Sequence, residues 1–203
     1  MTEEERMLAG LPYQAWKDGL PEKRIQSKHR FAAFNACPPE DTERQKELLR
    51  ELFGKIGENI EVFPPVYCDY GKNIEIGENF FASYNFTVID VAKVKIGDNV
   101  MIAANTTISS AGHPIHWEPR NAGYEYGIEV TIGNNVWIGA NCMVNPGVHI
   151  GNNVVIGSGS VVTKDIPDNV VAVGNPCRVM RVITDEDKQY YFKKRRFDEV
   201  EDN

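Results

Sequence analysis

The sequence predicts a mainly β protein in which six-residue repeats wind into a triangular prism. A small residue follows most of the repeated aliphatic positions, and another aliphatic or small residue stands four places later. The repeated aliphatic positions keep a strict spacing of six: Ile132, Ile138, Val144, Ile150, Ile156 and Val162. Such a period is typical of one short strand and one turn per repeat, stacked on the equivalent strand of the next coil. Because a closed coil needs three sides, three repeats of six predict eighteen residues per coil.

The repeat also predicts which side chains face the interior. The aliphatic position and the position four later point inward, so Cys142 is expected to be a small core residue and His149 to face outward. Gly133-Asn134-Asn135 and Gly151-Asn152-Asn153 are predicted corners, because Gly and Asn tolerate the left-handed backbone of tight turns. Upstream, the pattern slips by two residues between Val88 and Ile96, which predicts a bulge or loop there.

The 203-residue chain is long enough for one main domain with appendages. We expect a helical segment at 1–57 that packs on the prism, the prism itself at 58–183, and a charged tail at 184–203 that contains a helix. In the first segment, helices are predicted from about Pro21 to Asn35 and from Glu40 to Leu52, the second with a possible Thr42/Gln45 capping box. In the tail, Tyr190, Tyr191 and Phe192 are expected to pack against another part of the protein.

The repeat breaks off at residues 110–130, where polar and aromatic side chains replace the hexads. His113, His116 and Trp117 lie in this stretch. A long insertion in a repeat array is typical of a functional loop. We therefore predict that the loop carries the site.

Composition excludes several classes of protein. Lys and Arg number 22 against 29 Asp and Glu, a net charge of −7, so the chain lacks the global positive field that non-specific nucleic-acid binding needs. An acidic N-terminus and the lack of any apolar run of about 18 residues predict a cytoplasmic protein that does not enter a membrane. Cys37, Cys68, Cys142 and Cys177 form no C-x-x-C pair, which predicts reduced structural thiols and no metal site.

Several motifs accompany the hexads in one order: Ala111-Gly112-His113-Pro114, Trp137-Ile138-Gly139, Val161-Val162-Thr163-Lys164-Asp165-Ile166-Pro167 and Gly174-Asn175-Pro176. On these motifs the chain resembles the hexapeptide-repeat acetyltransferases, and within that group the galactoside and maltose O-acetyltransferases. The resemblance covers nearly the whole chain. It implies a left-handed parallel β-helix, a homotrimer, and acetyl-CoA as co-substrate lying between neighbouring helices.

Acetyl transfer from a thioester to a sugar hydroxyl requires a base, donors for the oxyanion and a means of holding both substrates. The family's catalytic histidine stands in the same setting before proline as His113, so the resemblance implies that His113 is the base. Imidazole suits this role because it exchanges protons near neutral pH. His29, His116 and His149 have no such support and are expected to be ordinary polar residues.

The resemblance also implies residues for the two substrates. Those that match cofactor contacts of the galactoside enzyme are Ala140, Ser158, Thr163, Lys164, Arg178 and Arg181. Those at or beside the positions that bind the acceptor are Asp69, Ser83, Asn85 and Asp90. The chain departs from the galactoside pattern at Ala15, Ser83 and Val91, whereas Asp69 and Asp90-Val91 look more like the maltose enzymes. These differences do not identify which sugar is the acceptor.

Other functions remain possible on this reasoning. The same scaffold could acetylate another small hydroxyl or an amine, such as an amino acid or an antibiotic. A metal-dependent hydratase resembling the γ-type carbonic anhydrases would need three zinc histidines, for which His113, His116 and His149 match the expected spacing poorly. A binding or structural prism without chemistry is the non-enzymatic alternative, against which His113, Trp137 and Thr163-Lys164 speak.

Overall fold

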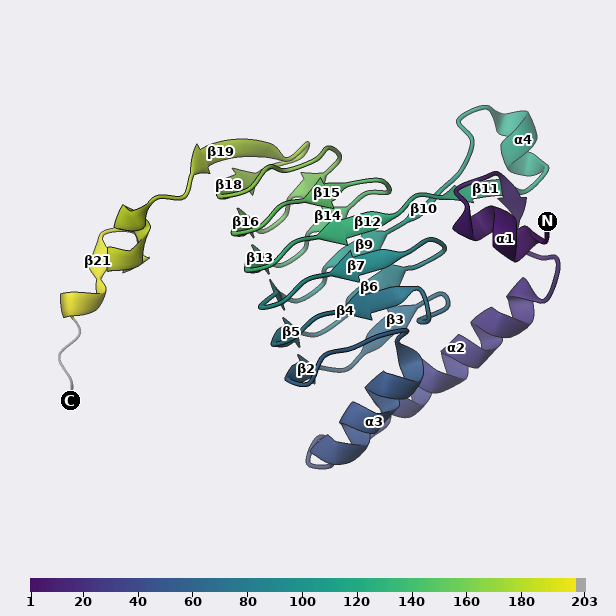
Figure 1. The fold of residues 1–203 in the computed structure, drawn as a ribbon, viewed down its shortest axis with the longest axis horizontal. Helices are drawn as coiled ribbons and strands as arrows, with labels where there is room; N and C mark the ends of the chain where they lie inside the picture. Colours follow the sequence, from purple (N-terminus) through teal and green to yellow (C-terminus); the bar gives the residue numbers. More distant parts are fainter. Residues whose placement is uncertain (200–203) are drawn as a thin grey trace.

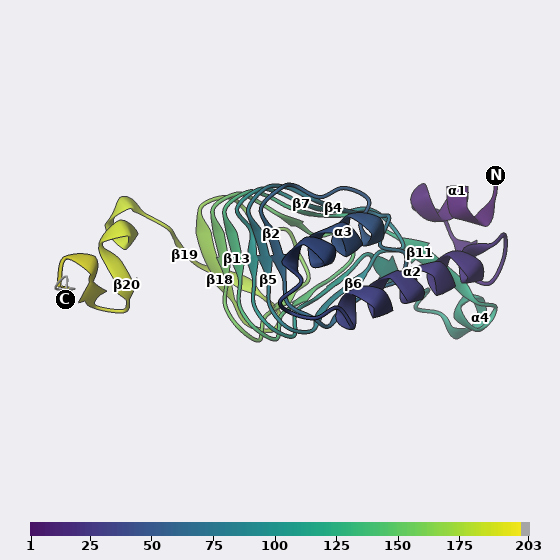
Figure 2. The ribbon, with the colours of Figure 1, turned by 90° about the horizontal axis from the view of Figure 1, so that it is seen from below.

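A computed structural model of the protein, which describes residues 1–199, shows a three-sided parallel β-helix with helices at one end (Figures 1 and 2). Face 1 consists of β2 (Ile60–Val62), β5 (Phe80–Ala82), β8 (Met101–Ile102), β13 (Val136–Ile138), β16 (Val154–Ile156) and β18 (Val170–Val173), extended by the antiparallel β19 (Arg178–Val182). Face 2 consists of β3 (Val66–Cys68), β6 (Phe86–Ile89), β9 (Thr107–Ser109), β14 (Met143–Val144) and β17 (Val161–Val162). Face 3 consists of β4 (Ile74–Ile76), β7 (Val94–Ile96), β12 (Val130–Ile132) and β15 (His149–Ile150).

Strand pairing confirms the predicted coil length and locates the departures from it. Trp137 pairs with Val155, eighteen residues later, as three hexads require. Phe81 pairs with Met101, twenty residues later, because the corner between faces 2 and 3 is two residues longer in this coil. The slip after Val88 is therefore a longer corner at 90–93, and the strand pairing there has no register shift.

The inward positions predicted from the hexads are all buried. From Ile132 to Ile166, each aliphatic position and each position four later is at most 3% exposed. Cys142 lies in this core as a free thiol, and His149 faces outward. Asn135 and Asn153 adopt φ of 57° and 53°, so they occupy the left-handed corners that the Gly-Asn-Asn motifs predict.

Two of the N-terminal helices pack at the start of the β-helix. The first, α2 (Leu20–Asn35), packs beside α3 (Thr42–Leu52), which lies across the open end of the prism (Figure 2). The apolar stripe of α3 enters the main core through Leu48, Leu49 and Leu52. These leucines exclude water from the end of the prism, where no further coil covers the interior.

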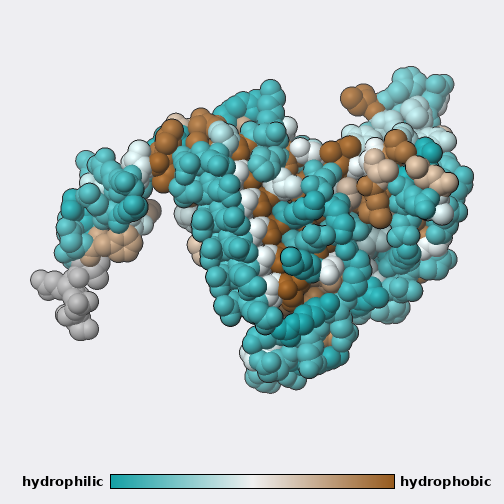
Figure 3. Space-filling model, viewed as in Figure 1, coloured by the Kyte–Doolittle hydropathy of each residue, from teal (hydrophilic) through white to brown (hydrophobic). Residues whose placement is uncertain are grey.

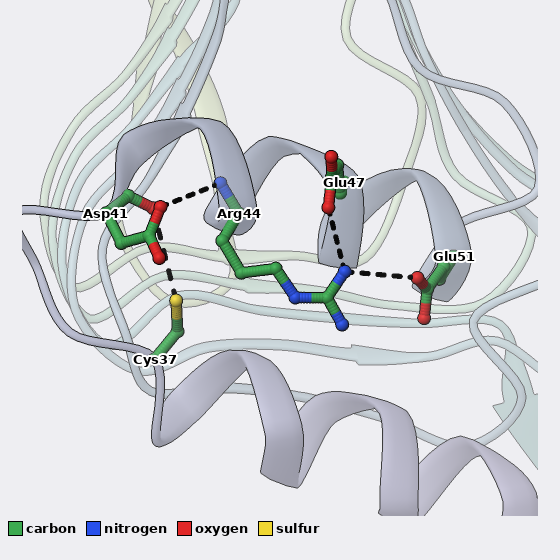
Figure 4. Close-up of polar contacts among 5 residues, drawn as sticks. All are labelled: Cys37, Asp41, Arg44, Glu47 and Glu51. Carbon is green, nitrogen blue, oxygen red and sulfur yellow. Dashed lines mark hydrogen bonds and ion pairs between the residues drawn. The ribbon is translucent and has the colours of Figure 1, made fainter.

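The N-cap of α3 differs from the predicted capping box at Thr42 and Gln45. Asp41 is the capping residue, and its carboxylate accepts a hydrogen bond from the backbone N–H of Arg44 at 3.2 Å (Figure 4). A carboxylate suits a helix N-terminus because the unpaired N–H groups there carry partial positive charge. The Arg44 side chain contacts Glu47 and Glu51 along the exposed side of the helix.

The helices of the charged tail are short 3-10 helices. After β19 it contains a 3-10 helix at Asp185–Gln189, a hairpin of β20 (Tyr190–Phe192) and β21 (Arg195–Arg196), and a 3-10 turn at Phe197–Glu199. Lys193 takes a φ of 52°, which reverses the chain where a helix would continue. Tyr191 and Phe192 are 49% and 55% exposed, and Tyr191 packs within the tail, with its ring centroid 5.6 Å from that of Phe197. The tail itself extends away from the prism (Figure 1).

We expect inward and outward positions of one strand to differ sharply in their effect on stability. Ile96 is 4% exposed in the core, and Ile96→Ala should lower the free energy of unfolding by about 2–5 kcal/mol. Lys95, its neighbour, faces outward and pairs with Glu129, so Lys95→Ala should cost less than about 1 kcal/mol. Urea denaturation of both variants would check this, and equal losses would contradict the inward assignment.

Candidate functional site

The insertion at residues 110–130 is a small folded unit joined to the N-terminus. It contains β10 (Ala111–Gly112), α4 (Trp117–Asn121) and β11 (Tyr124–Gly127). The central strand, β11, pairs with β10 on one side and with β1 (Tyr13–Gln14) on the other. Figure 1 shows α4 and β11 beside α1 (Glu3–Leu8), at the far side of the prism from the tail. The site loop therefore depends on a segment about a hundred residues earlier in the chain.

Side chains reinforce this pairing. Tyr13 is fully buried, and its hydroxyl donates a hydrogen bond to Glu125 Oε2 at 3.0 Å. Gln14 Nε2 donates to the carbonyl of Ala122 at 2.9 Å. The ring of Tyr126 packs directly on Gly112, because a Cβ there would lie 2.4 Å from Cζ of the tyrosine and the ring would have to move. These contacts fix the direction in which the chain leaves β10.

His113 is the first residue after β10, and its side chain is exposed. No hydrogen bond engages its ring within residues 1–199, so both nitrogens can meet a substrate. The side chains of the other two histidines in this half of the chain already contact neighbouring residues. His116 caps α4 by accepting from the N–H of Glu118 at 3.3 Å, and His149 contacts Thr131 on face 3.

A cluster of polar side chains lies at the corner that carries the insertion. Asp69 directly follows β3 and is half-buried. Arg24 reaches across from α2, donating to the hydroxyl of Tyr70 and to the carbonyl of Ala15, each at 2.8 Å. Burial raises the pKa of the Asp69 carboxyl above its usual range, while Arg24 opposes this. Burial likewise raises the pKa of Tyr70 to about 12. The half-buried carboxyl of Asp69 suits the hydroxyls of a polar ligand, whereas the hydroxyl of Tyr70 is buried and accepts from Arg24.

The predicted acceptor residues are not all at this corner. Asp69 and Asp90 lie between faces 2 and 3, whereas Ser83 and Asn85 lie between faces 1 and 2. Asn85 Nδ2 donates to Asn105 Oδ1 at 2.8 Å, as part of the stacking of that corner. The four residues of β6 separate the two corners, a span of roughly 13 Å at about 3.3 Å per residue. One chain therefore does not gather the four residues around one ligand.

The burial of Asp90 does not fit a direct contact with the substrate, which is the role that the resemblance implies for it. Its carboxyl is fully buried and accepts hydrogen bonds from the backbone N–H groups of Asp69, Tyr70 and Asn73. With no exposed surface, it touches the site only through the backbone that it holds.

The predicted cofactor residues are spread over the end of the prism where the tail begins. Ala140 and Ser158 lie at the corner between faces 1 and 2, Thr163 and Lys164 follow β17, and Arg178 and Arg181 lie on β19. A Cβ at Gly139 would lie 2.6 Å from Ser158, so this corner is closely packed. Arg178 Nη1 donates to the carbonyl of Cys177, and Arg181 forms a bidentate ion pair with Asp187.

The sequence matches two family patterns that correspond to these parts. Residues 6–57 match the maltose acetyltransferase hexapeptide capping motif, and residues 129–164 match the bacterial transferase hexapeptide in six repeats. Galactoside O-acetyltransferase of Escherichia coli (strain K12) is 53% identical over 93% of this chain and 93% of its own length. The chain belongs to the hexapeptide-repeat acetyltransferase family. This confirms the prediction from the sequence that the protein is an acetyltransferase enzyme.

Solved structures of this family confirm the fold. A maltose O-acetyltransferase from Clostridium difficile 630 is 52% identical, with a TM-score of 0.90 over 91% of this chain and 98% of that one. A galactoside acetyltransferase in complex with coenzyme A is also 52% identical, with a TM-score of 0.94 over 97% and 98%. The predicted left-handed parallel β-helix is therefore the fold of this acetyltransferase. Equal identity to both kinds of enzyme does not distinguish between their acceptors.

No helix within residues 1–199 is both long and apolar enough to span a membrane. Within the same residues, no three His, Cys, Asp or Glu side chains are grouped so that they could hold a metal ion.

Sequence reasoning missed several residues of this acetyltransferase's polar cluster, namely Tyr13, Arg24, Tyr70 and Glu125. Alternation in Tyr124-Glu125-Tyr126 indicates a strand, but nothing local indicates that Tyr13 pairs with it. The contacts join residues 112 and 46 positions apart. They depend on the N-terminal segment folding back over the corner.

The buried carboxyl of Asp90 should make the free energy of unfolding depend on pH. Burial, helped by the charge of Asp69, raises the pKa of its carboxyl to about 7, against hydrogen bonds from Tyr70 and Asn73. Because the folded pKa lies above the unfolded one, the stabilising proton is fully present below about pH 4 and is lost as the pH rises to about 7. We expect the free energy of unfolding to fall by up to ~1.4 kcal/mol per pH unit across this window, relative to Asp90→Asn.

Urea denaturation of the two proteins at several pH values would measure this difference. The Asp69 carboxyl is present in both proteins, and burial raises the pKa of the Cys68 thiol to about 12, outside this pH window, so the two proteins differ in the titration of Asp90. Parallel pH profiles would contradict the assignment.

Proposed function

We propose that the protein transfers the acetyl group of acetyl-CoA to a hydroxyl of a sugar, with His113 as general base. The observation that carries this proposal is the exposed His113 at the end of a fixed strand, above the corner that carries Asp69. Related proteins named galactoside and maltose O-acetyltransferases support a sugar as acceptor. The galactoside acetyltransferase in complex with coenzyme A supports the donor.

The reaction follows from these groups. A nitrogen of His113 accepts the proton of the sugar hydroxyl while the hydroxyl oxygen attacks the thioester carbon. The tetrahedral intermediate collapses, the carbon–sulfur bond breaks, and His113 returns the proton to the departing thiolate of CoA. Asp69 accepts hydrogen bonds from other hydroxyls of the sugar and so orients it.

The donor is anionic, and the chain provides cations where the proposal places it. Lys164, Arg178 and Arg181 are exposed near the start of the tail and suit the phosphates of CoA. Ala140 and Ser158 are small, so the pantetheine arm can approach the backbone beside them. The pairing of Arg181 with Asp187 means that Arg181 must exchange this partner or hold the phosphate together with it.

A homotrimer is part of the proposal, because the faces of the prism differ in polarity. Outward residues of face 1 form an apolar ladder in register, Phe81, Met101, Trp137 and Val155, in which Met101 and Trp137 are about half exposed. Outward residues of face 3 are polar or charged: Glu75, Lys95, Thr131 and His149. Figure 3 shows hydrophilic residues along one edge of the prism with hydrophobic surface beside them. A trimer would cover the apolar ladder.

The four free cysteines accord with a reducing, cytoplasmic location, which we include in the proposal.

We expect His113→Ala to lower kcat by about 10² to 10⁴, because the hydroxyl loses its proton acceptor. Affinity for acetyl-CoA, measured by calorimetry, should stay within about twofold. Release of free CoA thiol with maltose, glucose and galactosides as acceptors would measure turnover. His116→Ala, three residues away, is the matched control and should retain activity, since His116 caps α4. An unchanged rate in His113→Ala would refute its role.

If the protein is a trimer, a lysine introduced on face 1 and a lysine introduced on face 3 should affect its assembly differently. Met101→Lys places a charge in the apolar ladder and should shift the protein towards monomers at micromolar concentration. Thr131→Lys places the same charge on face 3 and should leave the assembly intact. Sedimentation velocity would distinguish the species, and a wild-type monomer would exclude the trimer.

A further inference from the structure

Buried polar side chains are concentrated at one corner of the prism, beneath the proposed site. Of the seven in residues 1–199, four lie at or beside the corner between faces 2 and 3: Asn73, Asp90, Ser109 and Ser110. Hexads fill the interior with aliphatic residues, so these polar groups are not needed to close a coil. Every buried side-chain nitrogen and oxygen of the described residues has a hydrogen-bond partner, so the corner is a complete network.

Asp90 connects its own coil to the coil below. Its Oδ1 accepts from the N–H of Asp69 at 3.0 Å and of Tyr70 at 2.9 Å, and its Oδ2 accepts from the N–H of Asn73 at 3.3 Å. Asn73 Nδ2 in turn donates to the main-chain carbonyl of Asp90 at 2.8 Å. The carboxyl therefore sets the position of the backbone that bears Asp69.

Ser110 makes the equivalent connection one coil higher. Its Oγ accepts from the N–H of Ala92 at 2.8 Å and donates to the carbonyl of Ile89 at 2.9 Å. Its carbonyl accepts from the N–H of Ile128, where the insertion returns to the prism. Ser110 stands three residues before His113, at the base of the insertion. Asp69, Asp90 and Ser110 thus occupy three successive levels of one corner.

We propose that Asp90 and Ser110 are positioning residues, which together hold Asp69 and His113 at the separation that a sugar acceptor requires. Asp90 sets the level that binds the acceptor, and Ser110 sets the level that carries the base. This inference rests on the proposed roles of Asp69 and His113.

The chemistry of the corner explains why a carboxylate stands at Asp90. An aliphatic side chain would leave three backbone N–H groups buried without partners, each at a substantial cost. A carboxylate can satisfy all three, although burial and the nearby charge of Asp69 disfavour its ionised form. At a regular corner a side-chain oxygen accepts one backbone N–H group of the neighbouring coil, as Asp98 does for Glu78, whereas the longer turn presents three N–H groups to Asp90.

Asp90→Asn tests the lower level. Asn retains the shape, but it can offer only one oxygen, and its amide N–H₂ must face a backbone N–H group. We expect the KM for the sugar to rise about tenfold while the KM for acetyl-CoA stays within about twofold. Circular dichroism and the affinity for acetyl-CoA would show that the variant folds.

The matched control is Asp98→Asn. Asp98 Oδ1 also accepts from a backbone N–H twenty residues earlier, that of Glu78 at 2.8 Å, but at the corner between faces 3 and 1. The same chemical change there should leave both KM values unaltered.

Ser110→Ala tests the upper level. It removes the partner of the Ala92 N–H and loosens the base of the insertion, so we expect kcat to fall about tenfold with little change in acetyl-CoA affinity. If Asp90→Asn does not fold, Ser110→Ala decides the inference by itself.

The outcomes separate this inference from the proposed function. A wild-type enzyme that acetylates no sugar would refute the function and the inference with it. Active wild type with unaltered kinetics in both variants, or with equal rises in both KM values, would overturn the inference and leave the function standing. Loss of activity in Asp98→Asn to the same extent would also overturn it, because the effect would then be one of stability alone.

Discussion

The structure depends on the stacking of each strand directly on its equivalent in the next coil. Parallel main-chain hydrogen bonds join the coils, and inward aliphatic residues lie above one another, so strand length and register cannot change. Extra residues are tolerated only at corners. Met101 pairs with Trp137, thirty-six residues later, and the whole insertion is accommodated between two strands that keep their register. Most of the candidate site therefore lies at corners, where the chain can vary without breaking a ladder.

The corner between faces 2 and 3 shows how such variation becomes a site. It is two residues longer than a hexad corner in the lower coils and carries the insertion above them. A loop of this length has few contacts of its own, and the N-terminal segment supplies them through β1 and a second small core that contains Met7, Tyr13, Leu20, Tyr70 and Val91. The N-terminal segment thus serves the site as well as the fold.

Local patterns predicted the prism well because the hexad is itself a local rule. Each inward position follows from spacing alone, and the Asn corners follow from the backbone that they require. The cap of α3 was misplaced by one residue, since Asp41 and Thr42 are both good capping residues and only the backbone decides between them. The charged helix formers of the tail do not reveal the left-handed turn at Lys193, which follows the first 3-10 helix. The burial of Asp90 could not be predicted, because a carboxylate at a turn has the same sequence signature whether it binds solvent, ligand or backbone.

Charge is separated along the molecule in a way that fits two different substrates. The chain carries a net charge of −7, and the carboxylates of Asp69 and Glu125 lie at the corner of His113. The cations Arg24 and Lys28 act on the Asp69 carboxyl, and Arg24 donates hydrogen bonds to Tyr70 and to the carbonyl of Ala15. Cations suited to phosphates lie instead at the corner after β17 and on β19, at the end of the prism where the tail begins. On the proposed assignment, these cations would hold the phosphates of the donor away from the carboxylates of Asp69 and Glu125, and only the thioester end of the donor would approach His113.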